Sequence, residues 1–399
     1  MAVNIAILGF GTVGSGVADI LLMNKDSIKA KTGKDIVLKH IKDIVDFPDS
    51  PFADLVTHND EDVFGDPELD VIIETIGGAR IAYEYTKRAL SQGISVVTSN
   101  KELVSTHGVE LLKLAEENGC SYLYEAAVGG GIPIIQPLYR DLAANKITRI
   151  AGIVNGTTNY ILTAMKDEGI SYEEALKQAQ ENGYAEADPT ADVEGIDAQR
   201  KLSILSTIAM EGNYVSPDEI HAEGISKLAL DDIDFNDKVQ AELKLVAYFE
   251  NNGNGAVAYV APTYISRRNL LSSVNGVFNA VMVDGNALGM SMYYGQGAGT
   301  MPTASAVFGD ILQVAVTDGK PLEPRLWKES DSKITPYAEV KADILVRLDS
   351  KADELVKAFE GYSPLAIGND AVMVNSISHA DAEKICAGID GAKWFHVLR

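Results

Sequence analysis

The feature that most restricts the fold of this chain is a glycine-rich turn directly after its first apolar segment. Residues 3–8 form a short apolar run, the turn Gly9-Phe10-Gly11-Thr12-Val13-Gly14 follows, and apolar residues then recur at helical spacing. A strand, a tight turn and a helix in this order match the GxGxxG pattern of a dinucleotide-binding unit. The first glycine allows the turn, the second lets a pyrophosphate approach the backbone, and the third lets helix and strand pack closely. We therefore predict that residues 9–14 bind a dinucleotide cofactor.

The end of the second expected strand, residues 36–41, bears on which cofactor binds. Lys42 and Asp43 follow it. An acidic residue here accepts a hydrogen bond from the ribose 2′-hydroxyl of NAD, whereas a basic residue pairs with the 2′-phosphate of NADP. Lys42 suits NADP, Asp43 suits NAD, and both residues are equally compatible with a solvated strand end. The sequence leaves the choice between NAD and NADP open.

Apolar strands alternate with helices through the first third of the chain. Further elements are expected as strands at 70–74, 95–98 and 121–125 and as helices at 79–92 and 109–119. This alternation is typical of a parallel, doubly wound sheet. We predict an α/β protein with a Rossmann-type domain over residues 1–135, to which a helix at about 299–320 returns.

The pattern changes after residue 146 to longer segments. Strands are expected at 147–154, 256–265 and 280–283, and helices at 160–168, 171–182 and 196–210. We predict an α/β catalytic and dimerisation domain over residues 136–298. The tail, residues 335–399, predicts a small α/β unit with strands at 342–348, 371–376 and 394–398 and helices at 351–359 and 380–389.

Composition restricts the partners of the chain. Its 57 acidic and 34 basic residues give a formal net charge of −23, so we expect neither nucleic acid nor an anionic membrane surface as a partner. The first apolar run is too short to cross a membrane. Cys120 and Cys386 lie far apart and have no CxxC partner, which fits a reducing cytoplasm. Cys120 precedes a strand and has no histidine near it, so we expect a buried thiol and not a nucleophile.

Several ordered motifs together resemble homoserine dehydrogenase over roughly residues 3–320. They are AILGFGTVGSGV near the start, IIETIGG at 72–78, VVTSNKELV at 96–104, YEAAVGGGIPII at 124–135, GIVNGTTNYIL at 152–162, NGYAEADPTADVEGIDAQRK at 182–201 and GQGAG at 295–299. Members of this family interconvert homoserine and aspartate 4-semialdehyde with NAD or NADP, a step of threonine and methionine biosynthesis. No kinase segment precedes the glycine turn, so we expect a monofunctional enzyme.

This reaction gives a reason for the polar residues between 183 and 201. Hydride transfer to an aldehyde develops negative charge on oxygen, so a positioned acid must supply a proton. By resemblance, Lys201 is this proton donor and acceptor, and Lys101 assists where cofactor and substrate meet. Asp197 lies four residues before Lys201 on an expected helix, so its carboxylate can orient the ammonium or bind the substrate amino group. Glu186 matches the family's acidic substrate ligand, and Gly183 lies where the backbone approaches a ligand.

Other residues of these motifs are expected to have structural roles or to contact the cofactor. Asp188, Asp192 and Glu194 are expected to be solvated or to cap helices. Beyond residues 9–14 and Lys42, the resemblance implies cofactor contacts at the ends of later strands and in later loops, from Ile76, Gly77, Thr98, Ser99, Lys101, Gly183 and Gly297.

A carboxylate before a glycine-rich turn suggests a cation site. Such a turn can direct several carbonyl oxygens toward one point, which suits a hard cation. Similar family members place a structural sodium ion there, so the expected ligands are Glu125 and the carbonyls of Val128, Gly130 and Ile132. The alternative is a turn that only joins two domains.

The element order of the tail resembles an ACT domain, a small amino-acid-binding module, but lacks one strand of the usual pattern. The resemblance implies an amino-acid effector such as threonine; the alternative is an extension that only stabilises a dimer. We expect a homodimer or homotetramer. Two other functions stay open on the sequence: another amino-acid dehydrogenase on the same scaffold, and a catalytically silent nicotinamide-binding regulator.

Overall fold

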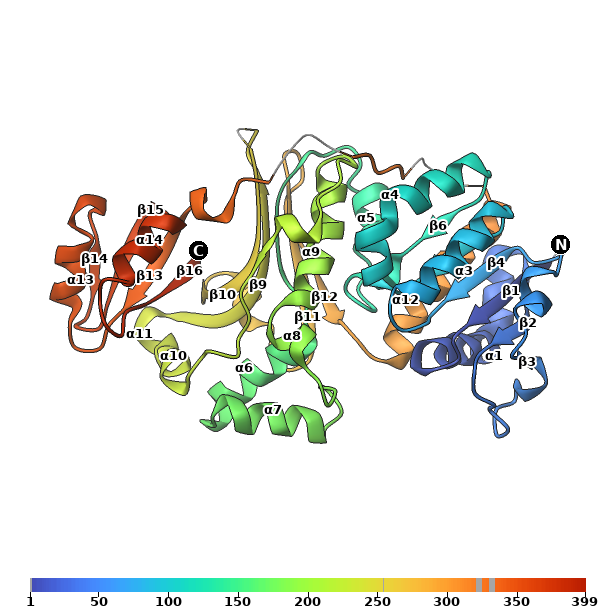
Figure 1. The fold of residues 1–399 in the computed structure, drawn as a ribbon, viewed down its shortest axis with the longest axis horizontal. Helices are drawn as coiled ribbons and strands as arrows, with labels where there is room; N and C mark the ends of the chain where they lie inside the picture. Colours follow the sequence, from blue (N-terminus) through green and yellow to red (C-terminus); the bar gives the residue numbers. More distant parts are fainter. Residues whose placement is uncertain (1, 254, 321–324, 330–333) are drawn as a thin grey trace. The chain divides into compact units, whose positions relative to one another are not determined.

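The computed structural model describes residues 2–253, 255–320, 325–329 and 334–399. These residues form two compact units (Figure 1). The first falls within Met1–Asn145, Ser203–Ser216 and Gly295–Asp331, and the second within Lys146–Leu202, Pro217–Tyr294 and Ser332–Arg399. Each unit has its own sheet.

The first unit is built on a six-stranded parallel sheet with the order β3-β2-β1-β4-β5-β6. Its strands are β1 (Ala2–Leu8), β2 (Asp35–Lys42), β3 (Val56–Thr57), β4 (Val71–Glu74), β5 (Ser95–Thr98) and β6 (Tyr122–Leu123). This is the strand order of a doubly wound dinucleotide-binding sheet, in which ligands bind beyond the carboxyl ends of the strands where the order reverses. The predicted Rossmann-type sheet is confirmed.

Helices complete the first unit. They are α1 (Thr12–Thr32), α2 (Asp60–Phe64), α3 (Arg80–Ser91), α4 (Lys101–Glu117), α5 (Ile135–Tyr139) and α12 (Thr300–Val316). α12 belongs to this unit and packs against α1. A Cβ on Gly16 would lie only 2.9 Å from Thr300 Cγ2 and 3.0 Å from Ala304 Cβ, so glycine permits this close crossing. The core between α1, α12 and the sheet is formed by apolar side chains such as Ile5, Val17 and Ile311.

The second unit is built on a mixed sheet with the order β12-β11-β7-β9-β10-β16-β13-β15-β14, with β8 paired to β10. The strands are β7 (Ile147–Ile153), β8 (His221–Ala222), β9 (Ala241–Asn251), β10 (Ala256–Ser266), β11 (Phe278–Gly285), β12 (Gly289–Gln296), β13 (Lys341–Arg347), β14 (Leu365–Ile367), β15 (Ala371–Ser378) and β16 (Lys393–Leu398). The helices are α6 (Gly156–Glu168), α7 (Tyr172–Glu181), α8 (Thr190–Val193), α9 (Ile196–Ala209), α10 (Leu230–Asp234), α11 (Asn236–Val239), α13 (Ala352–Ala358) and α14 (His379–Cys386). The second unit contains α9 only as far as Leu202, and the rest of this helix belongs to the first unit.

The tail has the full order β13-α13-β14-β15-α14-β16. This is the β-α-β-β-α-β arrangement of ferredoxin-like units. The expectation that one strand is missing is wrong, because β14, of three residues, supplies it. β16 also pairs in parallel with β10, so the tail continues the sheet of the second unit.

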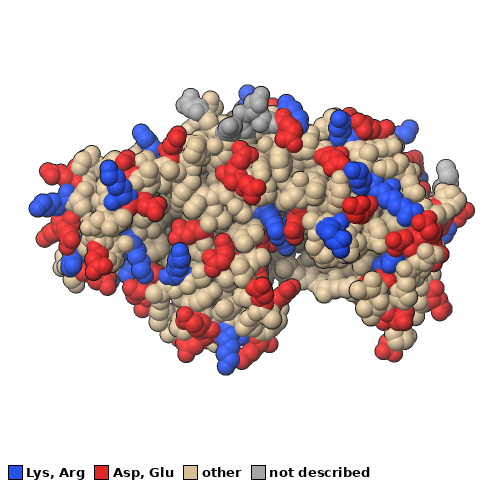
Figure 2. Space-filling view, viewed as in Figure 1, with Lys and Arg blue, Asp and Glu red and all other residues tan. Residues whose placement is uncertain are grey.

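The surface carries the excess of acidic residues in a dispersed form. On the face seen in Figure 2, carboxylates and basic side chains are intermixed and no broad basic patch is visible. Among the helices of the described residues, none is both long and apolar enough to cross a membrane.

Candidate active site

The glycine turn joins β1 to α1 with the geometry of a phosphate-binding loop. Gly9 has a φ of +89°, which favours glycine. A Cβ on Gly14 would lie 2.1 Å from the carbonyl oxygen of Gly9, so glycine is needed for helix and strand to pack this closely. Beside Gly11 the space is open, and no side chain caps α1, of which Thr12 and Val13 are the first residues. A pyrophosphate in this space would meet the first N–H groups of the helix.

Both residues at the end of β2 have partners. The carboxylate of Asp43 accepts the N–H groups of Phe10 at 2.6 Å and Ile44 at 2.7 Å, so it fixes the glycine turn. Lys42 is buried, and its ammonium lies 3.4 Å from Asp60 Oδ1. A ribose hydroxyl would therefore compete with backbone donors for Asp43, and a 2′-phosphate would compete with one carboxylate for Lys42.

Buried hydrogen bonds join the ends of β4 and β5. Glu74 is fully buried; its Oε2 accepts the hydroxyl of Thr98 at 2.6 Å and its Oε1 accepts the N–H of Ile76 at 2.7 Å. Thr98 Oγ1 in turn accepts the N–H of Asn100 at 2.9 Å. The cofactor contact predicted for Thr98 stays a prediction, and the side chain of this residue is fully buried in the network.

The other predicted cofactor residues of the first unit differ in accessibility. Gly77 is exposed, and Ser99 and Lys101 are half-buried, all three after the carboxyl ends of β4 and β5. Gly297 is buried, and its carbonyl oxygen would lie 2.3 Å from a Cβ on Gly130. The returning helix α12 begins after Gly299, and Gly297 lies in the loop before it.

The turn after β6 contains the predicted cation ligands. The carboxylate of Glu125 accepts the N–H groups of residues 134–136 at 2.6, 2.9 and 2.6 Å, so it caps the N-terminus of α5. Burial raises the pKa of this carboxyl. Within the described part of the chain, no backbone N–H donates to the carbonyls of Val128, Gly130 or Ile132. The carbonyls fit a cation, whereas the carboxylate is already occupied by the helix.

In the second unit, α9 carries a buried lysine–carboxylate pair. Lys201 is 9% exposed and Asp197 is 4% exposed. The ammonium of Lys201 donates to Asp197 Oδ2 at 2.6 Å and to the carbonyl oxygen of Val154 at 2.8 Å. The predicted contact across one turn of the helix is present. Because the pair is buried and bonded to the backbone, the ammonium has one defined position.

Two residues of this cluster were missed or underrated on the sequence. The side-chain amide of Asn155 donates to Asp197 Oδ2 at 2.9 Å and to Asp192 Oδ1 at 2.7 Å. The side-chain oxygen Oδ1 of Asn155 accepts the N–H of Thr158 at 2.8 Å and so caps α6. Asp192 thus joins the cluster and is not simply a solvated turn residue. The available signal was the position of Asn155 directly after a strand and before a helix.

Glu186 and Gly183 lie on the exposed segment between α7 and α8. Gly183 has a φ of +75°, and its Cβ position is open. The hydroxyl of Thr157, in the first turn of α6, donates to the carbonyl of Tyr184 at 2.6 Å and ties this segment to α6. Asp188 is exposed and accepts the N–H of Thr190 at 3.1 Å, so it lies in a turn before α8 and does not cap that helix.

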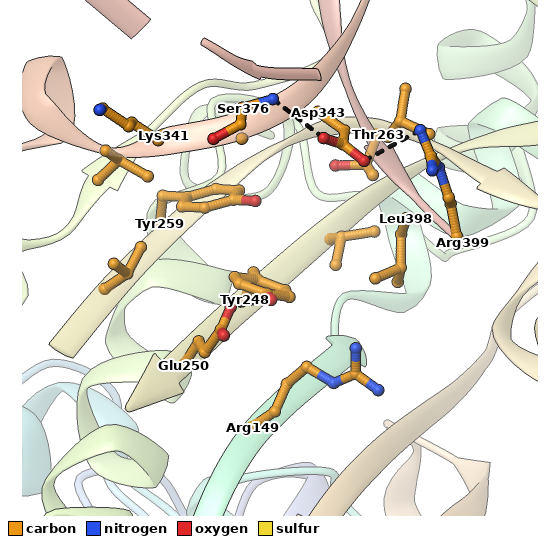
Figure 3. A pocket seen from close by; sticks show the side chains of 15 residues that line it. Arg149, Tyr248, Glu250, Tyr259, Thr263, Lys341, Asp343, Ser376, Leu398 and Arg399 are labelled. Carbon is orange, nitrogen blue, oxygen red and sulfur yellow. Dashed lines mark hydrogen bonds and ion pairs between the residues drawn. The ribbon is translucent and has the colours of Figure 1, made fainter. Parts of the chain in front are cut away.

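A separate pocket of about 330 Å³ lies on the sheet of the second unit, where β9 and β10 meet strands of the tail (Figure 3). Its charged side chains include Arg149, Glu250, Asp343 and Arg399. The Oδ2 atom of Asp343 lies 3.1 Å from Nη2 of Arg399. The hydroxyl of Tyr248 donates to Glu250 at 2.6 Å. None of the residues predicted for catalysis lines this pocket.

Cys120 is a buried thiol, as predicted. It is 2% exposed, and burial raises its pKa to about 11. A thiol with so high a pKa is not a ready nucleophile.

Family comparisons agree with these features. A family model described as the NAD binding domain of homoserine dehydrogenase matches residues 9–125, and one described as homoserine dehydrogenase matches residues 133–312. These stretches contain the glycine turn, the strand ends and the Lys201 cluster.

Known proteins resemble the chain over most of its length. The homoserine dehydrogenase of Bacillus subtilis is 41% identical over 351 residues, which cover 85% of this chain and 80% of the relative. The crystal structure of a homoserine dehydrogenase from Thiobacillus denitrificans has a TM-score of 0.90 at 34% identity and covers 100% of this chain and 98% of its own. A hyperthermophilic archaeal homoserine dehydrogenase in complex with NADPH has a TM-score of 0.68 at 30% identity over 81% of this chain and 100% of its own. Nothing in these comparisons supports another amino-acid dehydrogenase or a silent regulator. The chain belongs to the homoserine dehydrogenase family, NAD(P)-dependent oxidoreductases that act on a CH–OH group.

Proposed function

We propose that Lys201 is the general acid and base in the interconversion of homoserine and aspartate 4-semialdehyde. The observation that carries this proposal is its buried ammonium, held between Asp197 and the carbonyl of Val154. In the direction of reduction, Lys201 donates a proton to the carbonyl oxygen as negative charge develops there. In the reverse direction, neutral Lys201 removes the hydroxyl proton. A nicotinamide cofactor, when bound, would supply or accept the hydride, and Lys101, the first residue of α4, assists beside it.

Asp197 and Glu186 recognise the amino group of the substrate in this proposal. Asp197 also orients Lys201, so its replacement affects both binding and chemistry, whereas exposed Glu186 acts in binding alone. Steady-state kinetics of Glu186→Gln and Asp197→Asn test the assignment. We expect Glu186→Gln to raise KM for homoserine with little change in kcat, and Asp197→Asn to lower kcat as well. An unchanged KM in Glu186→Gln contradicts the role of Glu186.

We propose NADP as the preferred cofactor. Asp43, the residue that would accept from the 2′-hydroxyl of NAD, already accepts backbone N–H groups, and Lys42 offers a cation at the same strand end.

For the cation site, we propose that the carbonyls of Val128, Gly130 and Ile132 hold a structural sodium ion without the Glu125 carboxylate, which caps α5.

Three further proposals concern assembly, regulation and location. β12 is an edge strand with exposed Met290 and Tyr294, 52% and 54% exposed, which supports self-association into a dimer or tetramer.

The ferredoxin-like order of the tail supports an amino-acid effector such as threonine, and the pocket in Figure 3 offers it a place. Two buried free cysteines support a cytoplasmic location.

A further inference from the structure

Glu74 is a fully buried carboxyl group that the proposed chemistry does not use. It ends β4 at the carboxyl edge of the parallel sheet. Burial raises its pKa to about 7. Its neighbour Tyr122 has a buried hydroxyl that, within the described residues, lacks a hydrogen-bond partner. An ionisable group is costly at such a place, since an apolar residue would fill it without a desolvation penalty.

The carboxyl group joins the two segments that follow β4 and β5. One oxygen accepts the N–H of Ile76, in the first segment, and the other accepts the hydroxyl of Thr98, at the end of β5. Its two oxygens therefore fix the distance between two neighbouring strand ends.

Asn100 extends this connection to the start of α4. It donates its backbone N–H to Thr98 at 2.9 Å and its side-chain amide to the carbonyl of Gly78 at 2.8 Å. Its side-chain oxygen accepts the N–H of Leu103 at 3.0 Å and so caps α4. Lys101 is the first residue of that helix. The network thus determines where the backbone of Lys101 lies relative to residues 76–78.

We propose that Glu74 is a positioning residue for hydride transfer, which acts by holding Lys101 and residues 76–78 in register at the cofactor edge of the first unit. The inference rests on the proposed function, because it assumes that Lys101 assists at the nicotinamide. Glu74 is fully buried, so it acts through the segments that it holds. Replacing it with glutamine keeps its size but changes the connection: an amide N–H₂ turned toward Ile76 opposes another donor, and one turned toward Thr98 forces that hydroxyl to accept instead of donate.

The test is a double-mutant cycle of Glu74→Gln and Lys101→Ala, measured by homoserine-dependent NADP reduction and by NADPH binding. We expect Glu74→Gln to lower kcat by roughly 10- to 100-fold, as misplacement of a reacting group does, and to weaken NADPH binding. KM for homoserine should change little, because Glu186 and Asp197 belong to the second unit. In the Lys101→Ala background, Glu74→Gln should cost much less than in the wild type.

Two variants separate positioning from stability. Thr98→Val removes the hydroxyl that donates to Glu74 and accepts the N–H of Asn100, and it should show the same coupling to Lys101, even where Glu74→Gln folds poorly. Asp310→Asn alters another buried carboxyl of the first unit and should be additive with Lys101→Ala. A lower melting temperature with kcat and NADPH affinity unchanged overturns the inference, and so does additivity of Glu74→Gln with Lys101→Ala. Wild-type protein without turnover overturns the proposed function instead.

Discussion

Asn155 and Lys201 donate to the same carboxylate oxygen, Asp197 Oδ2, at 2.9 and 2.6 Å. The oxygen is thereby held between the end of β7 and helix α9. The direction in which Lys201 presents its ammonium depends on this arrangement, so we expect Asn155 to affect the proposed proton transfer through Asp197.

Asn155→Ser separates this role from helix capping. Serine still caps α6, so the free energy of unfolding should fall only through the lost amide hydrogen bonds, by about 1–3 kcal/mol. It lacks the amide donors to Asp197 and Asp192, so kcat should fall roughly 10- to 100-fold. Chemical denaturation and steady-state kinetics check both expectations. Asn155→Ala, which loses the cap as well, should be less stable than Asn155→Ser and equally slow; a wild-type kcat in either variant contradicts the positioning role.

Cofactor choice should depend on Lys42. Lys42→Glu places a negative charge beside the expected 2′-phosphate, so kcat/KM with NADP should fall at least 10-fold, while kcat/KM with NAD changes little. The ratio of the two constants is the measurement, and Lys39→Glu, at an exposed salt bridge of the same strand, is the control. Equal losses with both cofactors would refute a specific role in phosphate recognition.

Stability of the first unit should depend on pH through Asp310. Burial raises the pKa of its carboxyl from the ordinary 3.8 to about 7. Between these values the unfolded chain releases a proton that the folded chain keeps, so stability falls as pH rises. Asp310→Asn should flatten this fall. The single side-chain oxygen of asparagine cannot replace both carboxylate oxygens, which accept the Glu125 N–H and the Gln136 amide. At pH 5 the free energy of unfolding of the variant should therefore be lower by about 1–3 kcal/mol. Urea unfolding at pH 5 and 8 measures both effects, and identical pH slopes would contradict the explanation.

Much of the fold followed from local pattern. The glycine turn, the alternation of strands and helices and the four-residue spacing of Asp197 and Lys201 each reflect short-range geometry, and the structure agrees with them. β9 was missed because Ala241–Asn251 mixes charged and apolar residues without strict alternation. Its Glu242 and Lys244 are buried among partners contributed by distant segments. β14 was missed because three residues give too little pattern.

Side-chain direction accounts for the other errors. The rule that ligands bind beyond strand ends locates Thr98 correctly along the chain, but it does not say that the hydroxyl points inward to Glu74. Asn155 and Asp192 lie 37 residues apart, and only the fold brings them into contact.

In the proposed mechanism, Lys201 takes up the proton during oxidation of homoserine. The direct measurement is homoserine-dependent reduction of NADP by the wild type, by Lys201→Ala and by Lys177→Ala, whose side chain is 76% exposed in another i,i+4 pair. Loss of a general acid or base typically lowers the rate by about 10²- to 10⁴-fold. We predict a loss of this size in kcat for Lys201→Ala, with NADPH affinity nearly unchanged, and near-normal activity for Lys177→Ala. Near-normal turnover by Lys201→Ala would contradict the role of Lys201 as the general acid and base.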